Sequence, residues 1–312
     1  MRKVIKSFFI ILLTLLLSGC TSVQKSIFEF GLFVERYRSD LDYKTVSVNG
    51  ERYAYLERKG DGETIVLLHG FAANKDSWIR FVRYLHESYR VVVLDMPGHG
   101  DSRLDMSRSH NIEYIAASVA QIIDSLDIEK FHIAGNSFGG LVSTLYSLDS
   151  PDRIITLGLF DSAGVESPVK SEFYELLDKG DNPLVVKSEE EFDRLMRFNF
   201  NNEPFIPWPG RKVLARQFVQ RSEFNQKMWN DLFENRRNEN LNSRLAELKM
   251  PVFIIWGEKD RILHVSNTTI YKQNIPDSYV VVMKDCGHAP MLERPDEAAE
   301  HYSTFLKQLA AQ

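Results

Sequence analysis

The stretch FHIAGNSFGGLV, residues 131–142, decides the fold of this chain. Its first four residues form a mostly apolar run that is typical of a buried strand. After Gly139 and Gly140 the apolar residues recur at helical spacing. The stretch therefore predicts a strand that turns sharply into a helix, with Ser137 at the turn.

Gly135, Ser137 and Gly139 have the spacing G-x-S-x-G of a nucleophile elbow, in which one serine is raised above the end of a sheet. The turn forces the serine into a strained backbone conformation and brings strand and helix close together, so side chains at the two glycine positions would collide. The free N–H groups at the start of the helix favour a developing oxyanion. The alternative is a glycine-rich turn with an incidental serine.

The bulk composition is that of an ordinary globular protein. The chain has 312 residues, of which 44% are hydrophobic and 26% charged, so it has enough residues for a sizeable core. The net charge is -5 and no long run of Lys or Arg is present, which argues against nucleic acid as a partner.

Strands and helices alternate along most of the chain. A hairpin is predicted around Asn49-Gly50, and uninterrupted apolar runs then alternate with amphipathic helical segments. This alternation predicts an α/β fold with a mostly parallel, eight-stranded sheet and helices on both faces. The predicted strands are 44–48, 52–57, 64–68, 91–94, 131–134, 154–160, 252–256 and 279–283.

Residues 162–248 differ from the rest, because no run among them is typical of a buried strand. They are predicted to form a helical cap inserted into a core of residues 43–161 and 249–312. A cap at this place is expected over the carboxyl ends of the strands, where open α/β sheets bind ligands.

Three side chains fit nucleophilic catalysis. A serine is a weak nucleophile at neutral pH, and it needs an adjacent base that a third group orients. His288 follows the last predicted strand, which is the expected place for the base in the chain order serine, acid, histidine. Asp260, after the penultimate strand, is favoured as the acid over Asp161, which follows the preceding strand.

The chain resembles the α/β-hydrolases from about Tyr43 to Leu306. The segments HGFAANKDSW (69–78), DMPGHG (95–100) and IWGEKD (255–260) are similar to those of membrane-anchored monoacylglycerol lipases and related bacterial lipases. The resemblance implies Ser137, Asp260 and His288 as the triad and the amides of Phe71 and Phe138 as the oxyanion hole. His69 and His99 are expected to shape their loops.

The resemblance also implies the reaction, which is two-step acyl transfer through an acyl-enzyme, without a metal or cofactor. Acyl lipids such as monoacylglycerols or lysophospholipids are the leading substrates. In the predicted cap, Phe200, Phe205 and Trp208 are candidate substrate contacts. Two alternatives remain open: a hydrolase that cleaves carbon–carbon bonds in ring-fission products, and a hydrolase-fold lipoprotein that binds without catalysis.

Residues 1–20 have the features of a secretory signal, with basic residues, an apolar run over 8–17 and small residues before Cys20. Leu-Ser-Gly-Cys resembles the lipobox of bacterial lipoproteins, which implies lipidation of Cys20. Thr21 after the cysteine favours the outer membrane, on its periplasmic side. An uncleaved anchor and a soluble secreted form are the alternatives. Cys286 would then have no disulfide partner.

A juxtamembrane segment, residues 21–42, follows the predicted signal. Apolar residues recur at helical spacing between Ser26 and Leu41 and form a wide apolar face. Such a helix could lie on the lipid surface beside the anchor, or it could pack on the catalytic domain. The sequence leaves both arrangements open.

Overall fold

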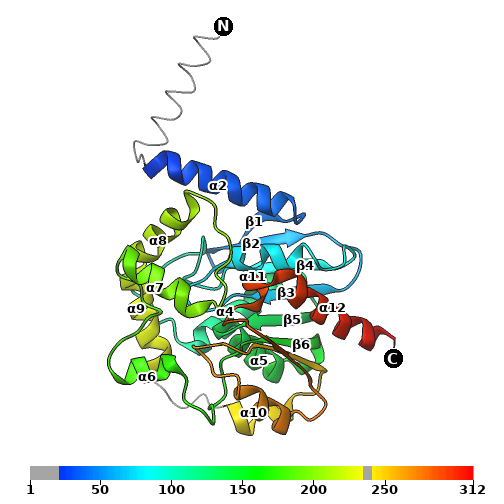
Figure 1. The fold of residues 1–312 in the computed structure, drawn as a ribbon. Helices are drawn as coiled ribbons and strands as arrows, with labels where there is room; N and C mark the ends of the chain where they lie inside the picture. The colour runs from blue at the N-terminus through cyan, green and yellow to red at the C-terminus, as the bar shows by residue number, and fades with distance from the viewer. Residues whose placement is uncertain (1–20, 235–240, 312) are drawn as a thin grey trace.

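Eight strands form one sheet in the computed structural model, which describes residues 21–234 and 241–311 (Figure 1). Their order across the sheet is β1-β2-β4-β3-β5-β6-β7-β8. β2 pairs antiparallel with β1 and with β4, and the remaining pairings are parallel, so the mixed, mostly parallel sheet agrees with the prediction. The strands are β1 (Asp42–Val48), β2 (Glu51–Arg58), β3 (Thr64–Leu68), β4 (Arg90–Leu94), β5 (Phe131–Asn136), β6 (Ile154–Phe160), β7 (Val252–Gly257) and β8 (Tyr279–Met283).

The helices alternate with the strands except between β6 and β7. There, four α-helices follow one another, and the described residues contain no strand. The α-helices are α2 (Thr21–Tyr37), α3 (Ile79–Val82), α4 (Ile112–Ser125), α5 (Phe138–Asp149), α6 (Glu172–Asp178), α7 (Glu189–Asn199), α8 (Gly210–Gln220), α9 (Ser222–Trp229), α10 (Asn267–Asn274), α11 (Pro290–Glu293) and α12 (Pro295–Ala310). We call α6 to α9 with their connections, residues 162–248, the helical insertion.

Helices cover both faces of the sheet, because the central strands send successive side chains to opposite sides. In β3, Val66 and Leu68 belong to one hydrophobic core, together with residues of α4 and α5. Ile65 and Leu67 belong to a second core, together with residues of α3 and α12. The uninterrupted apolar runs of the sequence are therefore strands that are buried on both faces.

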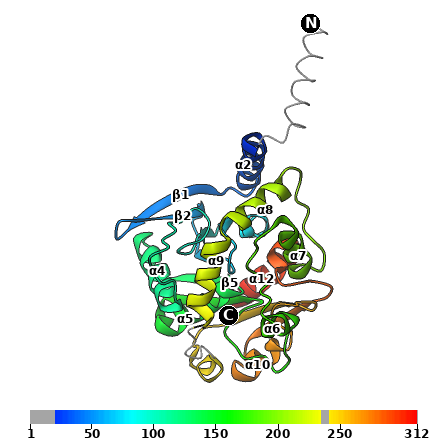
Figure 2. The same ribbon diagram turned by 90° about the vertical axis from the view of Figure 1, so that its left-hand side faces the viewer.

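The helical insertion stands on one side of the sheet, at the carboxyl ends of the strands (Figure 2). Arg221, at the end of α8, donates to the backbone oxygens of Gly98 and Gly100 in the loop after β4. Trp229 of α9 packs edge-on against Phe71 in the loop after β3. The insertion thus covers the edge at which open α/β sheets bind ligands.

Helix α2 packs on the catalytic domain through one face. Arg36 forms a bidentate ion pair with Asp76, with both nitrogen–oxygen distances at 2.8 Å, and Glu35 accepts from Arg83 at 2.9 Å. Gln24 is buried and accepts from Arg216 of α8. The helix begins at Thr21 and ends at Tyr37, so it starts earlier and stops earlier than the predicted span of 26–41.

None of the helices formed by residues 21–234 and 241–311 combines the length and the apolar character needed to cross a membrane. The predicted signal, residues 1–20, lies outside the described residues, and with it the predicted lipidation site at Cys20.

Candidate active site

Ser137 lies at the junction of β5 and α5 with backbone angles φ 53° and ψ -117°, a conformation that is unusual for a residue with a side chain. A Cβ atom on Gly135 would lie 2.2 Å from the carbonyl carbon and oxygen of Gly139. A Cβ atom on Gly139 would lie 2.4 Å from the backbone oxygen of Leu68. Both glycines are therefore required by the close approach of strand and helix, and Ser137 is left half-buried at the tip of the turn.

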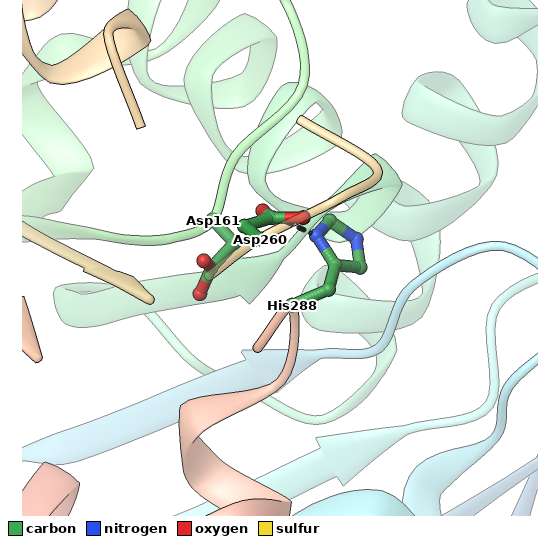
Figure 3. Close-up of side chains that lie close together, drawn as sticks. All are labelled: Asp161, Asp260 and His288. Carbon is green, nitrogen blue, oxygen red and sulfur yellow. Dashed lines mark hydrogen bonds and ion pairs between the residues drawn. The ribbon is translucent and has the colours of Figure 1, made fainter. Parts of the chain in front are cut away.

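His288 and Asp260 form a buried pair at the ends of β8 and β7 (Figure 3). The Nδ1 atom of His288 lies 2.7 Å from Oδ2 of Asp260. The other carboxylate oxygen of Asp260 accepts from the amides of Ile262 and Leu263, at 2.8 and 3.0 Å. Because the carboxylate accepts a hydrogen bond from Nδ1, the tautomer with the proton on Nδ1 is favoured. Nε2 is then available as a base.

Asn136 ties the histidine loop to the elbow. Its side-chain amide donates to the backbone oxygens of His288, at 3.0 Å, and Phe160, at 3.1 Å. Since Asn136 directly precedes Ser137, this contact holds the imidazole loop beside the serine. Within the described residues no hydrogen bond joins Ser137 to His288, and such catalytic bonds are often long before substrate binds.

Asp161 is the second carboxyl group beside the imidazole (Figure 3). It is fully buried at the end of β6, where Oδ1 accepts from the amide of Gly257 at 2.8 Å and Oδ2 has no hydrogen-bond partner among the described residues. Burial, and then the neighbouring Asp260 carboxylate, raises the pKa of Asp161 well above its ordinary value. The neutral form of Asp161 is therefore favoured, and the carboxylate that is hydrogen-bonded to His288 is that of Asp260.

The side chains of Asp161, Asp260 and His288 offer ligand atoms that lie within 4.8 Å of one another, a spacing that also suits a metal ion. Their hydrogen bonds favour another use, because both oxygens of Asp260 already have partners in His288 and two backbone amides. The donor set thus orients an imidazole and leaves few free lone pairs for a cation.

The two backbone amides expected to hold an oxyanion, those of Phe71 and Phe138, both lie close to Ser137 in the fold. Phe138 is the first residue of α5, so its N–H has no partner within the helix. A Cβ atom on Gly70 would lie 3.4 Å from Cβ of Ser137, which places the start of the loop after β3 against the nucleophile. In the part of the chain that the structure describes, the amide of Phe71 donates no hydrogen bond. This position suits the role expected for Phe71 and Phe138.

Aromatic side chains of the helical insertion contact the same loop. Trp229 lies edge-on to Phe71, with ring centroids 5.6 Å apart. Phe233, in the π-helix η3 (Asn230–Glu234), lies 6.4 Å from Phe71 and 4.2 Å from Trp229. Phe173 of α6 completes the group at 5.7 Å from Trp229. We call these four residues the aromatic cluster.

The three predicted substrate contacts lie at two different places in the structure, and their contact with a substrate stays a prediction. Phe205 and Trp208 are 79% and 54% exposed, and they lie in the connection between α7 and α8, beside α2. Phe200 is buried in the second core, and its backbone abuts the loop before His288. Trp229 and Phe233 are among the large apolar residues of the predicted cap, but their contact with Phe71 joins the insertion to the loop after β3 and is not encoded in any local pattern.

His69 and His99 shape loops, as expected. The Nδ1 group of His69 donates to the backbone oxygen of Gly70, and its Nε2 accepts from the amide of Met96. Burial lowers the pKa of His69 to about 4, so this side chain is a neutral brace between two loops. His99 is also buried and packs on His69, with ring centroids 4.8 Å apart.

The family is decided by a match over residues 63–295 to the family described as alpha/beta hydrolase fold. The chain belongs to the α/β-hydrolases. This hydrolase is 30% identical to Lipase 1 of Psychrobacter immobilis, over 97% of this chain and 98% of that one. It is 28% identical to monoacylglycerol lipase abhd6-B of Xenopus laevis, over 86% and 83% of the two chains.

A solved structure also covers the whole hydrolase. The crystal structure of a membrane phospholipase A, described as a novel bacterial virulence factor, is 35% identical with a TM-score of 0.91, and 100% of each chain is covered. The eight-stranded sheet is therefore that of an α/β-hydrolase, as the sequence predicts. By these relatives the chain is a lipase- or esterase-like hydrolase.

Proposed function

We propose that the chain is a serine carboxylic-ester hydrolase that acts on acyl lipids such as monoacylglycerols or lysophospholipids. The observation that carries the proposal is the buried Asp260–His288 hydrogen bond, held beside the elbow of Ser137 by Asn136. A serine without a neighbouring base is a weak nucleophile, whereas this arrangement supplies an oriented imidazole near Ser137 at the strained turn.

The reaction has two steps. As Oγ of Ser137 attacks the ester carbonyl, its proton passes to Nε2 of His288, and Asp260 stabilises the imidazolium. The amides of Phe71 and Phe138 hold the oxyanion, and each such donor contributes about 3 to 4 kcal/mol to lowering the barrier. The imidazolium then protonates the departing alcohol, leaving an acyl group on Ser137. Water, deprotonated by His288, releases the fatty acid and restores the serine.

The surroundings of Phe71 support an acyl lipid as substrate. The aromatic cluster lies beside the proposed oxyanion hole, and its partly exposed members, Phe71 and Phe233, are the rings that we expect an acyl chain to contact. Each CH₂ group buried against such a surface contributes about 0.8 kcal/mol. A long acyl chain is therefore expected to bind better than an acetyl group.

The place of action is part of the proposal. Residues 1–20 carry the features of an export signal with a lipidated Cys20, which would hold the catalytic domain at a bacterial membrane, with the periplasmic side of the outer membrane favoured. The similarity to a membrane phospholipase A and to a monoacylglycerol lipase supports a substrate drawn from the bilayer. The carbon–carbon hydrolases act on soluble dienoates, so export disfavours that alternative.

A fluorophosphonate probe tests the nucleophile. The wild-type protein is expected to react and Ser137→Ala is expected not to react, whereas an unlabelled wild-type protein would favour the non-catalytic alternative. The substrate class is tested with p-nitrophenyl esters of increasing chain length, monoacylglycerols, lysophospholipids and a dienoate ring-fission product. A preference for acetyl over long chains by more than about tenfold in kcat/KM would contradict the lipid assignment.

A further inference from the structure

The outer face of α2 carries a row of aromatic side chains. Phe30, Phe33 and Tyr37 follow one another at helical spacing, and their rings are stacked with centroids 6.4 and 6.5 Å apart. They are 66%, 61% and 75% exposed. The opposite face of the helix packs on the domain through Gln24 and Glu35, so the row is directed away from the domain.

Two further exposed aromatic residues, Phe205 and Trp208, lie in the connection between α7 and α8, which packs on the domain-facing side of α2. Arg80 donates to the backbone oxygen of Phe205 at 3.1 Å and also contacts the carboxylate of Glu35 in α2. A Cβ atom on Gly210 would contact both Ile206 of this connection and Phe28 of α2. The connection therefore borders the helix that carries the row. We call Phe30, Phe33, Tyr37, Phe205 and Trp208 the aromatic face.

The members of the aromatic face are the five most exposed large hydrophobic side chains in the described part of the chain. Single exposed apolar residues are normal on soluble proteins, but a group of rings on neighbouring elements marks a binding surface. Tyrosine and tryptophan bury an apolar ring at the boundary between lipid and water while their polar group stays hydrated, and phenylalanine adds a purely apolar ring to such a face.

We propose that the aromatic face binds the surface of a phospholipid bilayer. The position of the face selects this partner, because α2 begins at Thr21, directly after Cys20 and the apolar run of residues 8–17. A membrane that holds those residues therefore lies next to the first turn of α2. The inference rests on the membrane attachment included in the proposed function. The two arrangements considered for the juxtamembrane segment are then compatible, because one side of α2 packs on the domain while the other side contacts lipid.

Trp208 is a natural reporter for this contact. The chain has four tryptophans, and the other three, Trp78, Trp229 and Trp256, are buried. The full chain is reconstituted into phosphatidylethanolamine and phosphatidylglycerol vesicles, with and without brominated acyl chains that quench tryptophan fluorescence on contact. We expect strong quenching in the wild-type protein and little in Trp208→Phe. Equal, weak quenching in both would overturn the proposal.

The row on α2 is tested by the triple variant Phe30→Ser/Phe33→Ser/Tyr37→Ser, measured in the same vesicles. We expect the quenching of Trp208 to fall to the level of Trp208→Phe, while kcat/KM for a soluble ester stays at the wild-type value. A triple variant that keeps wild-type quenching would overturn the assignment of the row to the membrane contact.

The matched control is Met106→Ser/Val169→Ser/Val282→Ser, which removes three exposed hydrophobic side chains outside the aromatic face. This variant is expected to keep wild-type quenching, and an equal loss would contradict the proposal because it would show a nonspecific effect. A photo-crosslinking amino acid at position 33 separates the occupants: crosslinks to lipid support the proposal, and crosslinks to a second copy overturn it. Quenching does not require catalysis, so a failure of the ester-hydrolase proposal would leave this result standing.

Discussion

Two aspartates flank the imidazole of His288, and their surroundings differ. Asp260 accepts three hydrogen bonds, from His288 and from two backbone amides. Asp161 accepts one hydrogen bond, from the amide of Gly257. Its full burial and the neighbouring Asp260 carboxylate raise its pKa, which favours its neutral form. One aspartate therefore orients the histidine, and the other is a neutral neighbour that keeps its proton.

The first prediction separates these roles by substitution. Asp260→Asn is expected to lower kcat by about 10⁴-fold, because the amide favours the wrong imidazole tautomer, as in serine proteases. Asp161→Asn is expected to keep kcat close to the wild-type value, because asparagine has the shape of the protonated acid and can still accept from Gly257. Steady-state kinetics on one p-nitrophenyl ester measures both. A large loss only in Asp161→Asn would reverse the assignment of the triad acid.

The second prediction concerns stability and pH. Folding raises the pKa of Asp161, so the native state keeps a proton that the unfolded chain releases above about pH 4. This group's contribution to stability is complete below that pH and is lost as the pH rises toward the folded pKa. Asp161→Asn removes this pH-dependent loss.

Urea unfolding of wild type and Asp161→Asn at several pH values tests the sign. The free energy of unfolding of the variant, relative to wild type, is expected to increase from pH 4 to pH 8. A difference that stays constant, or that shifts toward wild type, would show that Asp161 ionises as easily in the folded protein as in the unfolded chain.

At the scale of elements, the helical insertion meets the sheet domain through loops that also carry the active site. Trp229 of α9 packs on Phe71, and Arg221 of α8 donates to the loop after β4. The loops after β3 and β4 are themselves joined by Lys75, which is buried and lies 2.9 Å from Asp95 and 2.7 Å from Asp101. A change in the insertion can therefore reach the oxyanion hole through direct contacts.

The third prediction follows from this contact. Trp229→Ala is expected to lower kcat/KM for long-chain esters more than for acetyl esters, because an acyl chain loses apolar surface beside Phe71. Losing contact with two CH₂ groups corresponds to about 1.6 kcal/mol, or more than tenfold. The control is Phe218→Ala, which removes another aromatic ring of the insertion that packs on Phe192. Equal losses for all chain lengths in Trp229→Ala would contradict the assignment.

Local signals in the sequence predicted several strands with their exact bounds. The bounds of β3 and β6 match the predicted strands because buried apolar runs of this length have few other solutions, and those of the partly exposed β8 match as well. The predicted hairpin at Asn49-Gly50 is confirmed, with φ angles of 52° and 79° that suit the tight turn. Asp260 and His288 lie at strand ends, so the topology alone brings them to one edge.

The sequence was less informative where contacts between distant segments decide the arrangement. Phe205 and Trp208 are large apolar side chains of the kind that contact lipid substrates, but the connection that carries them lies against α2, which the sequence did not indicate. His110 is buried against Phe224 of α9, a contact between distant segments that no local pattern indicates. The spacing of apolar residues gives the faces of a helix, but it does not give the partner that each face meets.

At the scale of the whole molecule, the proposed membrane attachment lies in residues 1–20. The fourth prediction tests the anchor. Wild-type protein expressed in bacteria with radiolabelled palmitate is expected to incorporate the label, and Cys20→Ala is expected to lose it. Cys286→Ser is the matched control, since Cys286 is the other cysteine of the chain and is buried. Labelling that survives Cys20→Ala would show that the lipid is attached elsewhere.

The bidentate pair between Arg36 and Asp76 fixes the position of α2 relative to the domain. A domain on a flexible linker could take many distances from a membrane, whereas a domain fixed to a helix that follows the anchor would keep its entrance at a constant distance from the lipid. For an N-terminally anchored chain, the encounter with substrate then becomes a search in two dimensions. Lateral diffusion within one leaflet, and the ester content of that leaflet, would set how often the enzyme turns over.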